Sequence, residues 1–266
     1  MIKHIFSDMD GTLLQSNGKI SANNIEIIKK SKIPFTLVSA RSPKEMFEVI
    51  DLLALSEPQI AFNGGLIFQL QDGKVKALKE DTIVNDSVAR IVELCKKEFP
   101  SVSCSFYGQD TWYIDRMDSG IEMEKRIGGQ TPKMVDFVTL LKQAATKIYK
   151  IMFITMDLQK MKPLIARLKE LGENVSINQS GQRYLEITSQ NAEKSEGIGY
   201  IKKLENLDKE EMAAFGDGFN DVSMLKSVGV PIVMDNALEG VHNYGKYITK
   251  DNDHDGVGHG IQKYLI

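Results

Sequence analysis

The chain opens on the stretch MIKHIFSDMDGTLL, residues 1–14, and this stretch decides the fold. Its first part, from Ile2 to Ser7, is short, largely apolar and contains β-branched residues, and it stops abruptly at Asp8 and Asp10. Such a pattern predicts a buried strand that runs directly into a polar loop. We therefore expect both aspartates at the carboxyl end of a strand.

The segments that follow alternate between helical and extended patterns. Ser21 is a typical N-cap for a helix that reaches Lys30. Further strands are expected over 34–38, 59–62, 212–215 and 231–234, and further helices over 43–53, 194–204 and 221–228. This alternation predicts parallel βαβ units in an open sheet, which is an α/β fold.

The middle of the chain has a different rhythm, in which helices are mixed with two hairpins. The elements expected there cover residues 87–98, 101–114, 121–127, 147–155, 158–171 and 175–188. The mixture predicts an α+β domain over residues 82–187. We expect this domain to be inserted into an α/β core domain made of residues 1–81 and 188–266.

Composition excludes several classes of protein. With 42% hydrophobic residues the chain can build a sizeable core, so it is not a disordered protein. No apolar run has the length of a membrane span, and the N-terminus lacks a signal-peptide layout. A net charge of −3 argues against a general nucleic-acid binder. The two cysteines, Cys95 and Cys104, are expected to be reduced thiols of a cytoplasmic protein.

Four polar clusters fall at strand or helix ends of the α/β halves. They are Asp8 with Asp10, Ser39 with Arg41, Lys194, and Asp217 with Asn220 and Asp221. Each cluster alone is weak evidence, because polar turns are common. Ligands collect at the carboxyl ends of the strands of such sheets, and all four clusters are expected at that edge.

The chemistry of these clusters indicates a metal-assisted reaction. Carboxylates that converge on one sheet edge repel one another unless a cation lies among them. Oxygen ligands with few histidines favour a hard cation, Mg²⁺ in preference to Zn²⁺. An aspartate in such a place can itself attack phosphorus and form an aspartyl phosphate.

The motifs Asp8-Met9-Asp10-Gly11-Thr12-Leu13, Ser39-Ala40-Arg41, Lys194 and Gly216-Asp217-Gly218-Phe219-Asn220-Asp221 resemble those of the haloacid dehalogenase superfamily. The closest resemblance is to the Cof-type phosphatases, which carry a type IIB cap between their second and third motifs. It covers essentially the whole chain. It implies a Rossmann-like core with an inserted α+β cap, and a Mg²⁺-dependent phosphatase of small phosphorylated metabolites, sugar phosphates first.

The resemblance also implies roles for the acidic residues. Asp8 is the expected nucleophile, and Asp10 the expected general acid and base. Mg²⁺ is expected on the Asp8 carboxylate, the Asp10 backbone carbonyl and Asp217, with Asp221 no closer than the second shell of ligands.

The remaining site residues are assigned in the same way. The transferring phosphoryl group is expected to contact Ser39, the Ala40 amide, Lys194 and Asn220. Thr12 is expected to brace the loop after the first strand, while Arg41 and Asp221 are secondary members of the site. The expected substrate is a small phosphorylated metabolite, with no nucleic acid or membrane partner. We expect the protein to be a monomer or homodimer.

The chain departs from the family pattern at three positions. Ala40 stands where glycine is common, and its amide can still face a phosphate. Glu196, just after Lys194, is expected to face solvent at a helix N-terminus. Asp235 stands where glycine is usual, which leaves open a substrate-side role of the loop from Met234 to Ala237.

Two other functions and one misleading motif remain to be weighed. A phosphomutase has the same four clusters, and a catalytically weak regulator that binds phosphorylated metabolites usually lacks one of the acids or the lysine. The stretch Asp251 to Gly256 copies the first half of an EF-hand loop, but position twelve is Gln262 where Ca²⁺ needs a glutamate. We interpret this stretch as a polar turn before the last helix.

Overall fold

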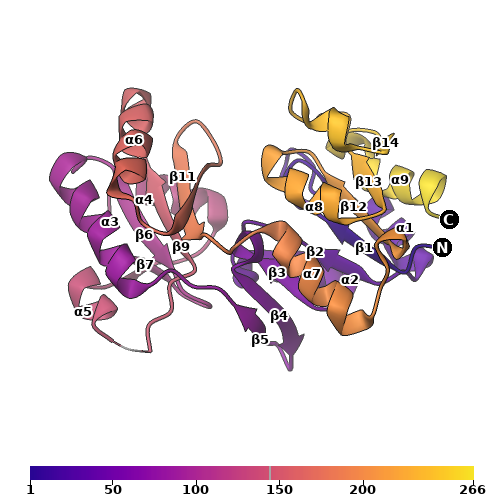
Figure 1. The fold of residues 1–266 in the computed structure, drawn as a ribbon, viewed down its shortest axis with the longest axis horizontal. Coiled ribbons are helices and arrows are strands. Elements are labelled where there is room, and N and C mark those ends of the chain that lie inside the picture. The colour runs from indigo at the N-terminus through magenta and orange to yellow at the C-terminus, as the bar shows by residue number, and fades with distance from the viewer. Residues whose placement is uncertain (144) are drawn as a thin grey trace. The chain divides into compact units, whose positions relative to one another are not determined.

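The computed structural model describes residues 1–143 and 145–266, which form two compact units. The core domain contains Met1–Arg41, Met46–Lys79 and Glu193–Ile266, and the inserted domain contains Ser42–Glu45 and Glu80–Ala192. Both termini therefore belong to the core domain (Figure 1).

The core domain is built on a parallel sheet. Its strands, in the order β14-β13-β12-β1-β2, are Tyr247–Ile248, Val230–Val233, Met212–Gly216, His4–Ser7 and Phe35–Leu37. β1 is central and pairs in parallel with β12 on one side and β2 on the other. A parallel bridge from Val38 to Ile60 adds β3 (Gln59–Ala61) beside β2. The expected open parallel sheet is confirmed.

Helices bury both faces of this sheet. α7 (Lys194–Glu205) and α8 (Val222–Ser227) pack their apolar residues with Phe6 and Ala214 on one face. α1 (Ala22–Ser31) and α9 (Gly256–Tyr264) contact each other, and α9 approaches Phe215 of the opposite face. α2 covers Pro43–Leu53, the range expected from the sequence. The result is the three-layered arrangement typical of doubly wound α/β domains.

Besides the short β14, two further strands of the core region were not expected. β4 (Leu66–Gln71) pairs antiparallel with β3, and β5 (Lys74–Glu80) follows it in a three-stranded sheet. β5 has no continuous apolar pattern, because its residues are mostly half-exposed. They include Lys74, Lys76 and Lys79. Hydrophobic periodicity therefore gave little signal for this strand.

The inserted domain is a second, mixed sheet with helices. Its strands, in the order β10-β11-β9-β6-β7-β8, are Val175–Gln179, Tyr184–Ser189, Lys150–Ile154, Ser103–Tyr107, Trp112–Ile114 and Lys133–Met134. The two expected hairpins are β6 with β7 and β10 with β11, and both are antiparallel. The expected helix over 158–171 begins later, at Met161, after a short 3₁₀ turn.

The two faces of this second sheet differ in chemistry. One face packs an apolar core that includes Phe106, Ile151 and Leu185 under α3 (Asn85–Glu98), α5 (Phe137–Leu141) and α6 (Met161–Leu171). The opposite face carries Tyr107, Lys150 and Thr188 in directly paired positions, and α4 (Ser119–Gly128) contacts β6 there. Strand alternation thus separates an apolar layer from a polar one.

Cys95 and Cys104 are both buried and free, and burial raises the pKa of each thiol. Across residues 1–143 and 145–266, no helix combines the length and apolar character that crossing a bilayer requires.

Candidate active site

The polar loops expected at one sheet edge do follow the carboxyl ends of neighbouring strands. Asp8 comes directly after β1, Ser39 follows β2, and Asp217 comes directly after β12. Because β1 lies between β12 and β2, the three loops meet at the centre of the sheet edge.

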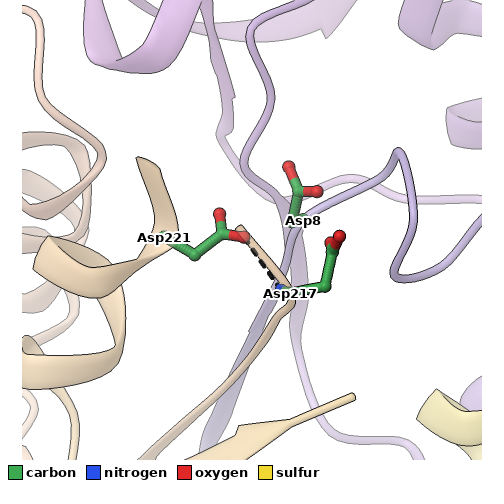
Figure 2. A group of neighbouring side chains, drawn as sticks. All are labelled: Asp8, Asp217 and Asp221. Carbon is green, nitrogen blue, oxygen red and sulfur yellow. Dashed lines mark hydrogen bonds between the residues drawn. The ribbon is translucent and has the colours of Figure 1, made fainter. Parts of the chain in front are cut away.

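Three carboxylates converge at this edge. Asp8, Asp217 and Asp221 each offer an oxygen, and these oxygens all lie within 4.8 Å of one another (Figure 2). Asp8 is 6% exposed and Asp221 is fully buried. The Nζ atom of Lys194, the first residue of α7, lies 2.5 Å from Asp8 Oδ1 and 2.6 Å from Asp221 Oδ1. The cluster is thus three carboxylates around one buried ammonium.

The electrostatics of this cluster are those of an incompletely neutralised site. Burial raises the pKa of Asp8 well above its usual value, and the charge of Asp221 adds to that effect while Lys194 opposes it. Burial also raises the pKa of Asp217 to about 6. The pKa of Lys194 is raised, because the two carboxylates outweigh the cost of its burial. One ammonium cannot neutralise three carboxylates, so the residues present fit a divalent cation with oxygen ligands.

Asp221 uses both carboxylate oxygens within the protein. Oδ1 accepts from Lys194, while Oδ2 accepts from the backbone N–H groups of Asp217 at 3.0 Å and Gly218 at 2.9 Å. Asp221 therefore shapes the loop after β12 and holds Lys194 in place.

The loop after β1 contacts the side chain of Asp217 closely. The Thr12 hydroxyl donates to Asp217 Oδ1 at 2.6 Å, and Thr12 is fully buried. Gly11 has a φ of +77°, and a Cβ at this position would lie 2.5 Å from Asp217 Oδ2. Only glycine fits this backbone at this distance from the carboxylate.

The Asp10 side chain lies apart from the three carboxylates. Its two oxygens accept from Arg41 Nε at 2.9 Å and Arg41 Nη2 at 2.6 Å, and the side chain is 60% exposed. Sequence reasoning placed Arg41 in the site but missed this two-pronged pairing. The sequence indicated only that both residues follow expected strands, and the structure shows that these strands, β1 and β2, are neighbours.

Ser39, Ala40 and Asn220 differ in exposure. Ser39 is 1% exposed, and its Oγ accepts the Arg41 backbone N–H at 3.1 Å. Ala40 is half-buried beside it, whereas Asn220 is exposed on the loop after β12. All three lie on loops at the same sheet edge as Asp8.

The turn from Phe62 to Gly64 lies against the loop after β2. The sequence indicated a glycine turn here, with Asn63 as a secondary candidate near the phosphate pocket. The Asn63 N–H donates to the Ser39 carbonyl at 2.8 Å, and the Phe62 N–H donates to the Arg41 carbonyl at 3.0 Å. Gly64 has a φ of +104°, and a Cβ there would lie 2.2 Å from the Glu193 carbonyl oxygen. This turn therefore joins the loop after β2 to the residue before Lys194.

The EF-hand-like stretch forms a turn, as interpreted from the sequence. Asp251 accepts the backbone N–H of His254 at 2.9 Å, and Asp253 accepts from the Ser16 N–H at 2.8 Å and hydroxyl at 2.6 Å. Among the residues that the structure describes, only the group of Asp8, Asp217 and Asp221 has metal-binding spacing. Glu196 is 61% exposed and lies 3.8 Å from Lys79 Nζ, so it faces solvent.

Comparison with known proteins agrees with this geometry. A family model described as haloacid dehalogenase-like hydrolase matches residues 5–261. The chain belongs to the haloacid dehalogenase superfamily. It is 26% identical over 283 residues to the 5-amino-6-(5-phospho-D-ribitylamino)uracil phosphatase of Bacillus subtilis, covering 99% of this chain and 98% of that protein.

Solved structures of this superfamily share the fold over the full length. A haloacid dehalogenase-like hydrolase from Bacteroides thetaiotaomicron is 25% identical and superposes with a TM-score of 0.88 over 100% of both chains. A sugar phosphatase of subclass IIB, 22% identical, superposes with a TM-score of 0.80 over 98% of both chains. The expected superfamily and the fold of a parallel core with an inserted α+β domain are confirmed, and the chain is a phosphatase of the haloacid dehalogenase type.

Proposed function

We propose that this haloacid dehalogenase-type phosphatase is a Mg²⁺-dependent phosphomonoesterase of small phosphorylated metabolites, with sugar phosphates as the main class. Reaction proceeds through an aspartyl phosphate on Asp8. The observation that carries the proposal is the buried Asp8 carboxylate, which lies 2.5 Å from Lys194 Nζ and within 4.8 Å of two further carboxylates.

Each half of the reaction uses the same two aspartates. An Asp8 oxygen attacks phosphorus, the bond from phosphorus to the ester oxygen breaks, and Asp10 gives its proton to the leaving alkoxide. Asp10 then takes a proton from water, whose oxygen attacks the phosphoryl group and releases Asp8. The exposure of the Asp10 side chain, 60%, suits a group that exchanges protons with solvent.

The remaining groups hold charge in place. The carboxylates of Asp8 and Asp217 and the backbone carbonyl of Asp10 would hold Mg²⁺, which supplies charge neutralisation for the incoming phosphate. Ser39, the Ala40 amide, Lys194 and Asn220 would bind the phosphoryl oxygens. The charge of Lys194 opposes the rise in the pKa of Asp8 that burial causes.

The inserted domain over residues 82–187, which we propose acts as the cap, contains a layer of buried polar side chains. Lys150 is 3% exposed, lies 3.6 Å from Glu186 and stacks over the Tyr107 ring at 4.7 Å. Glu124 of α4 accepts from the Tyr107 hydroxyl at 3.3 Å. These groups are buried and pair with one another, so the relatives, and not this layer, support the proposed hydroxyl-rich leaving group. The ribityl phosphate named for the Bacillus subtilis relative is of this kind.

The test compares Asp8→Asn with Asp72→Asn on 4-nitrophenyl phosphate in the presence of Mg²⁺. Asp72 lies in the exposed β4–β5 turn with a φ of +52°, which asparagine also tolerates. We expect Asp8→Asn to lose at least roughly 1,000-fold in kcat, and Asp72→Asn to match the wild type. Wild-type activity in Asp8→Asn contradicts the assignment of the nucleophile.

A second assay separates a phosphatase from a mutase. Free phosphate released from a hexose phosphate is measured alongside the appearance of a positional isomer of that hexose phosphate. We expect phosphate release at the rate of substrate loss; isomer formation with little phosphate release would instead support a phosphomutase.

A further inference from the structure

The loop of residues 234–238, which follows β13, contacts both acidic loops of the site. The Met234 N–H donates to the Gly216 carbonyl at 3.1 Å, and the Leu238 N–H donates to the Asp217 carbonyl at 3.0 Å. Between them, the Asn236 side-chain Nδ2 donates to the Gly11 carbonyl at 2.8 Å. The loop therefore ties the segment after β1 to the segment after β12.

The Asn236 amide is fixed at both of its ends. Its Nδ2 faces the Gly11 carbonyl, which can only accept, and its Oδ1 accepts the Asn252 backbone N–H at 3.1 Å. Only one orientation of the amide satisfies both partners. Asn252 is 7% exposed, and its own Nδ2 donates to the Leu14 carbonyl at 2.9 Å. A buried asparagine thus supports an exposed one, and together they hold two carbonyls of the loop after β1.

Gly11 is consequently restrained from two sides. Its Cα faces the Asp217 carboxylate so closely that a Cβ would lie 2.5 Å from Oδ2, and its carbonyl is held by Asn236. Gly11 directly follows Asp10, so the peptide unit that contains the Asp10 carbonyl ends at this restrained residue.

We propose that Asn236 is a positioning residue for phosphoryl transfer. It holds Gly11, and through Gly11 it sets the place of the Asp10 carbonyl and carboxylate, without contacting substrate or metal. The proposal rests on the roles proposed above for Asp10. Displacement of a reacting group by about 1 Å can cost on the order of 100-fold in rate, so one hydrogen bond at this point matters more than its strength suggests.

The test variant is Asn236→Asp. A carboxylate has the same size and can still accept the Asn252 N–H, but it cannot donate to the Gly11 carbonyl. We expect kcat for phenyl phosphate to fall by roughly 10-fold or more with KM little changed. We expect a smaller loss for 4-nitrophenyl phosphate, whose leaving group needs less protonation. The rise in Tm that Mg²⁺ causes is expected to be smaller than in the wild type.

The matched control is Asn17→Asp, the same chemical change in the loop after β1. Asn17 uses only its Oδ1, which accepts the Lys19 N–H at 2.9 Å, and a carboxylate keeps that bond. We expect wild-type kinetics from this control. Wild-type kcat and an unchanged ratio between the two esters in Asn236→Asp overturn the proposal. An equal loss for both esters with a lower Tm shows a purely structural role and also overturns it.

Failure of the proposed function would look different. In that case Asp8→Asn retains wild-type activity, and the positioning role falls with the nucleophile whatever Asn236→Asp does. If Asp8→Asn is inactive and Asn236→Asp is normal, only the positioning role is wrong.

Discussion

The core domain carries two aspartate-rich loops of similar composition, residues 8–12 and 251–255, whose carboxylates behave in opposite ways. Burial raises the pKa of Asp8 well above its usual value. Hydrogen bonds lower the pKa of Asp253, chiefly the one from the Ser16 hydroxyl, and that of Asp251, chiefly the one from the His254 side chain. Carboxylates that are buried with too few donors favour an added cation, whereas carboxylates with their own donors are already satisfied.

This difference separates a site from a turn better than composition does. Each loop is rich in aspartates within five residues, and a motif search on acidic spacing selects either one. The first loop differs because it follows β1, which lies between β12 and β2 in the sheet. Neighbouring segments therefore add Asp217 and Lys194 to it. The second loop lies before α9 and binds the loop after β1 through Ser16.

The largest effect is expected from Lys194→Met, which removes the ammonium from the first loop's cluster. Asp8 and Asp221 then stay buried with no cation beside them, and breaking such a pair by removing one partner costs about 3–5 kcal/mol. We expect kcat to fall by roughly 1,000-fold. Steady-state kinetics and urea unfolding of the metal-free protein measure the two effects.

The control for this prediction is Lys30→Met. Lys30 pairs with Glu26 at 2.5 Å, but both side chains are more than half exposed. An exposed pair of this kind contributes little to stability, because solvent screens it. Equal losses of stability in the two variants would contradict the buried character of the Lys194 cluster.

The second prediction concerns pH and compares the loops directly. The folded-state pKa of Asp217 is raised to about 6, so the folded protein binds a proton more tightly than the unfolded chain. Without metal, stability from this group is therefore present at low pH and is lost as pH rises from about 4 to 6, by up to about 3 kcal/mol. Asp8 acts in the same direction.

The Asp253 carboxylate acts in the opposite direction, because its pKa is lowered. Its contribution is present above its unfolded pKa and is lost as pH falls. Mg²⁺ competes with protons for the carboxylates of Asp8 and Asp217 but not for that of Asp253. We therefore expect a larger Mg²⁺-induced rise in Tm at pH 7 than at pH 5. Asp217→Asn should abolish most of that difference, and Asp253→Asn should preserve it. A Mg²⁺ effect independent of pH would contradict the proposed ligands.

The third prediction concerns Arg41, which holds the Asp10 carboxylate with two nitrogens. Arg41→Lys keeps the charge but loses the two-pronged geometry, since an ammonium presents a single point of contact. We expect kcat for phenyl phosphate to fall by about 10-fold, and by less for 4-nitrophenyl phosphate, because Asp10 protonates the leaving group. The ratio of kcat values for the two esters is the measurement. Equal losses for both esters would show that Arg41 acts elsewhere in the reaction.

Much of the fold and of the site follows from local patterns in the chain. The strand before Asp8, the N-cap at Ser21 and the polar strand ends were readable because each depends on a few neighbouring residues. The α/β sheet brings Asp8 and Asp217 together at the ends of their strands, and Lys194 joins them from the first turn of α7. β5 could not be predicted in this way, because its residues are mostly half-exposed and show no clear apolar period.

Contacts between distant loops were equally out of reach of the sequence. The pairing of Arg41 with Asp10 and the hydrogen bond from Asn236 to Gly11 join segments 31 and 225 residues apart. Spacing along the chain carries no record of such contacts, since they depend on which strands become neighbours and on the exact path of each loop. Gly64 is similar, because its need for glycine comes from Glu193, far along the chain.

The smallest effect is expected from Asp253→Asn, in the loop that resembles an EF-hand. The asparagine keeps one oxygen, so only one of the two bonds from Ser16 has to weaken, and the site is exposed. We expect kcat within about twofold of the wild type and only a small loss of stability. Titration with Ca²⁺ should change Tm equally in the wild type and in Asp253→Asn, since position twelve of the motif is Gln262. A Ca²⁺-dependent Tm that Asp253→Asn abolishes would make this loop a second metal site. It would then erase the contrast between satisfied and unsatisfied carboxylates on which the assignment of Asp8 depends.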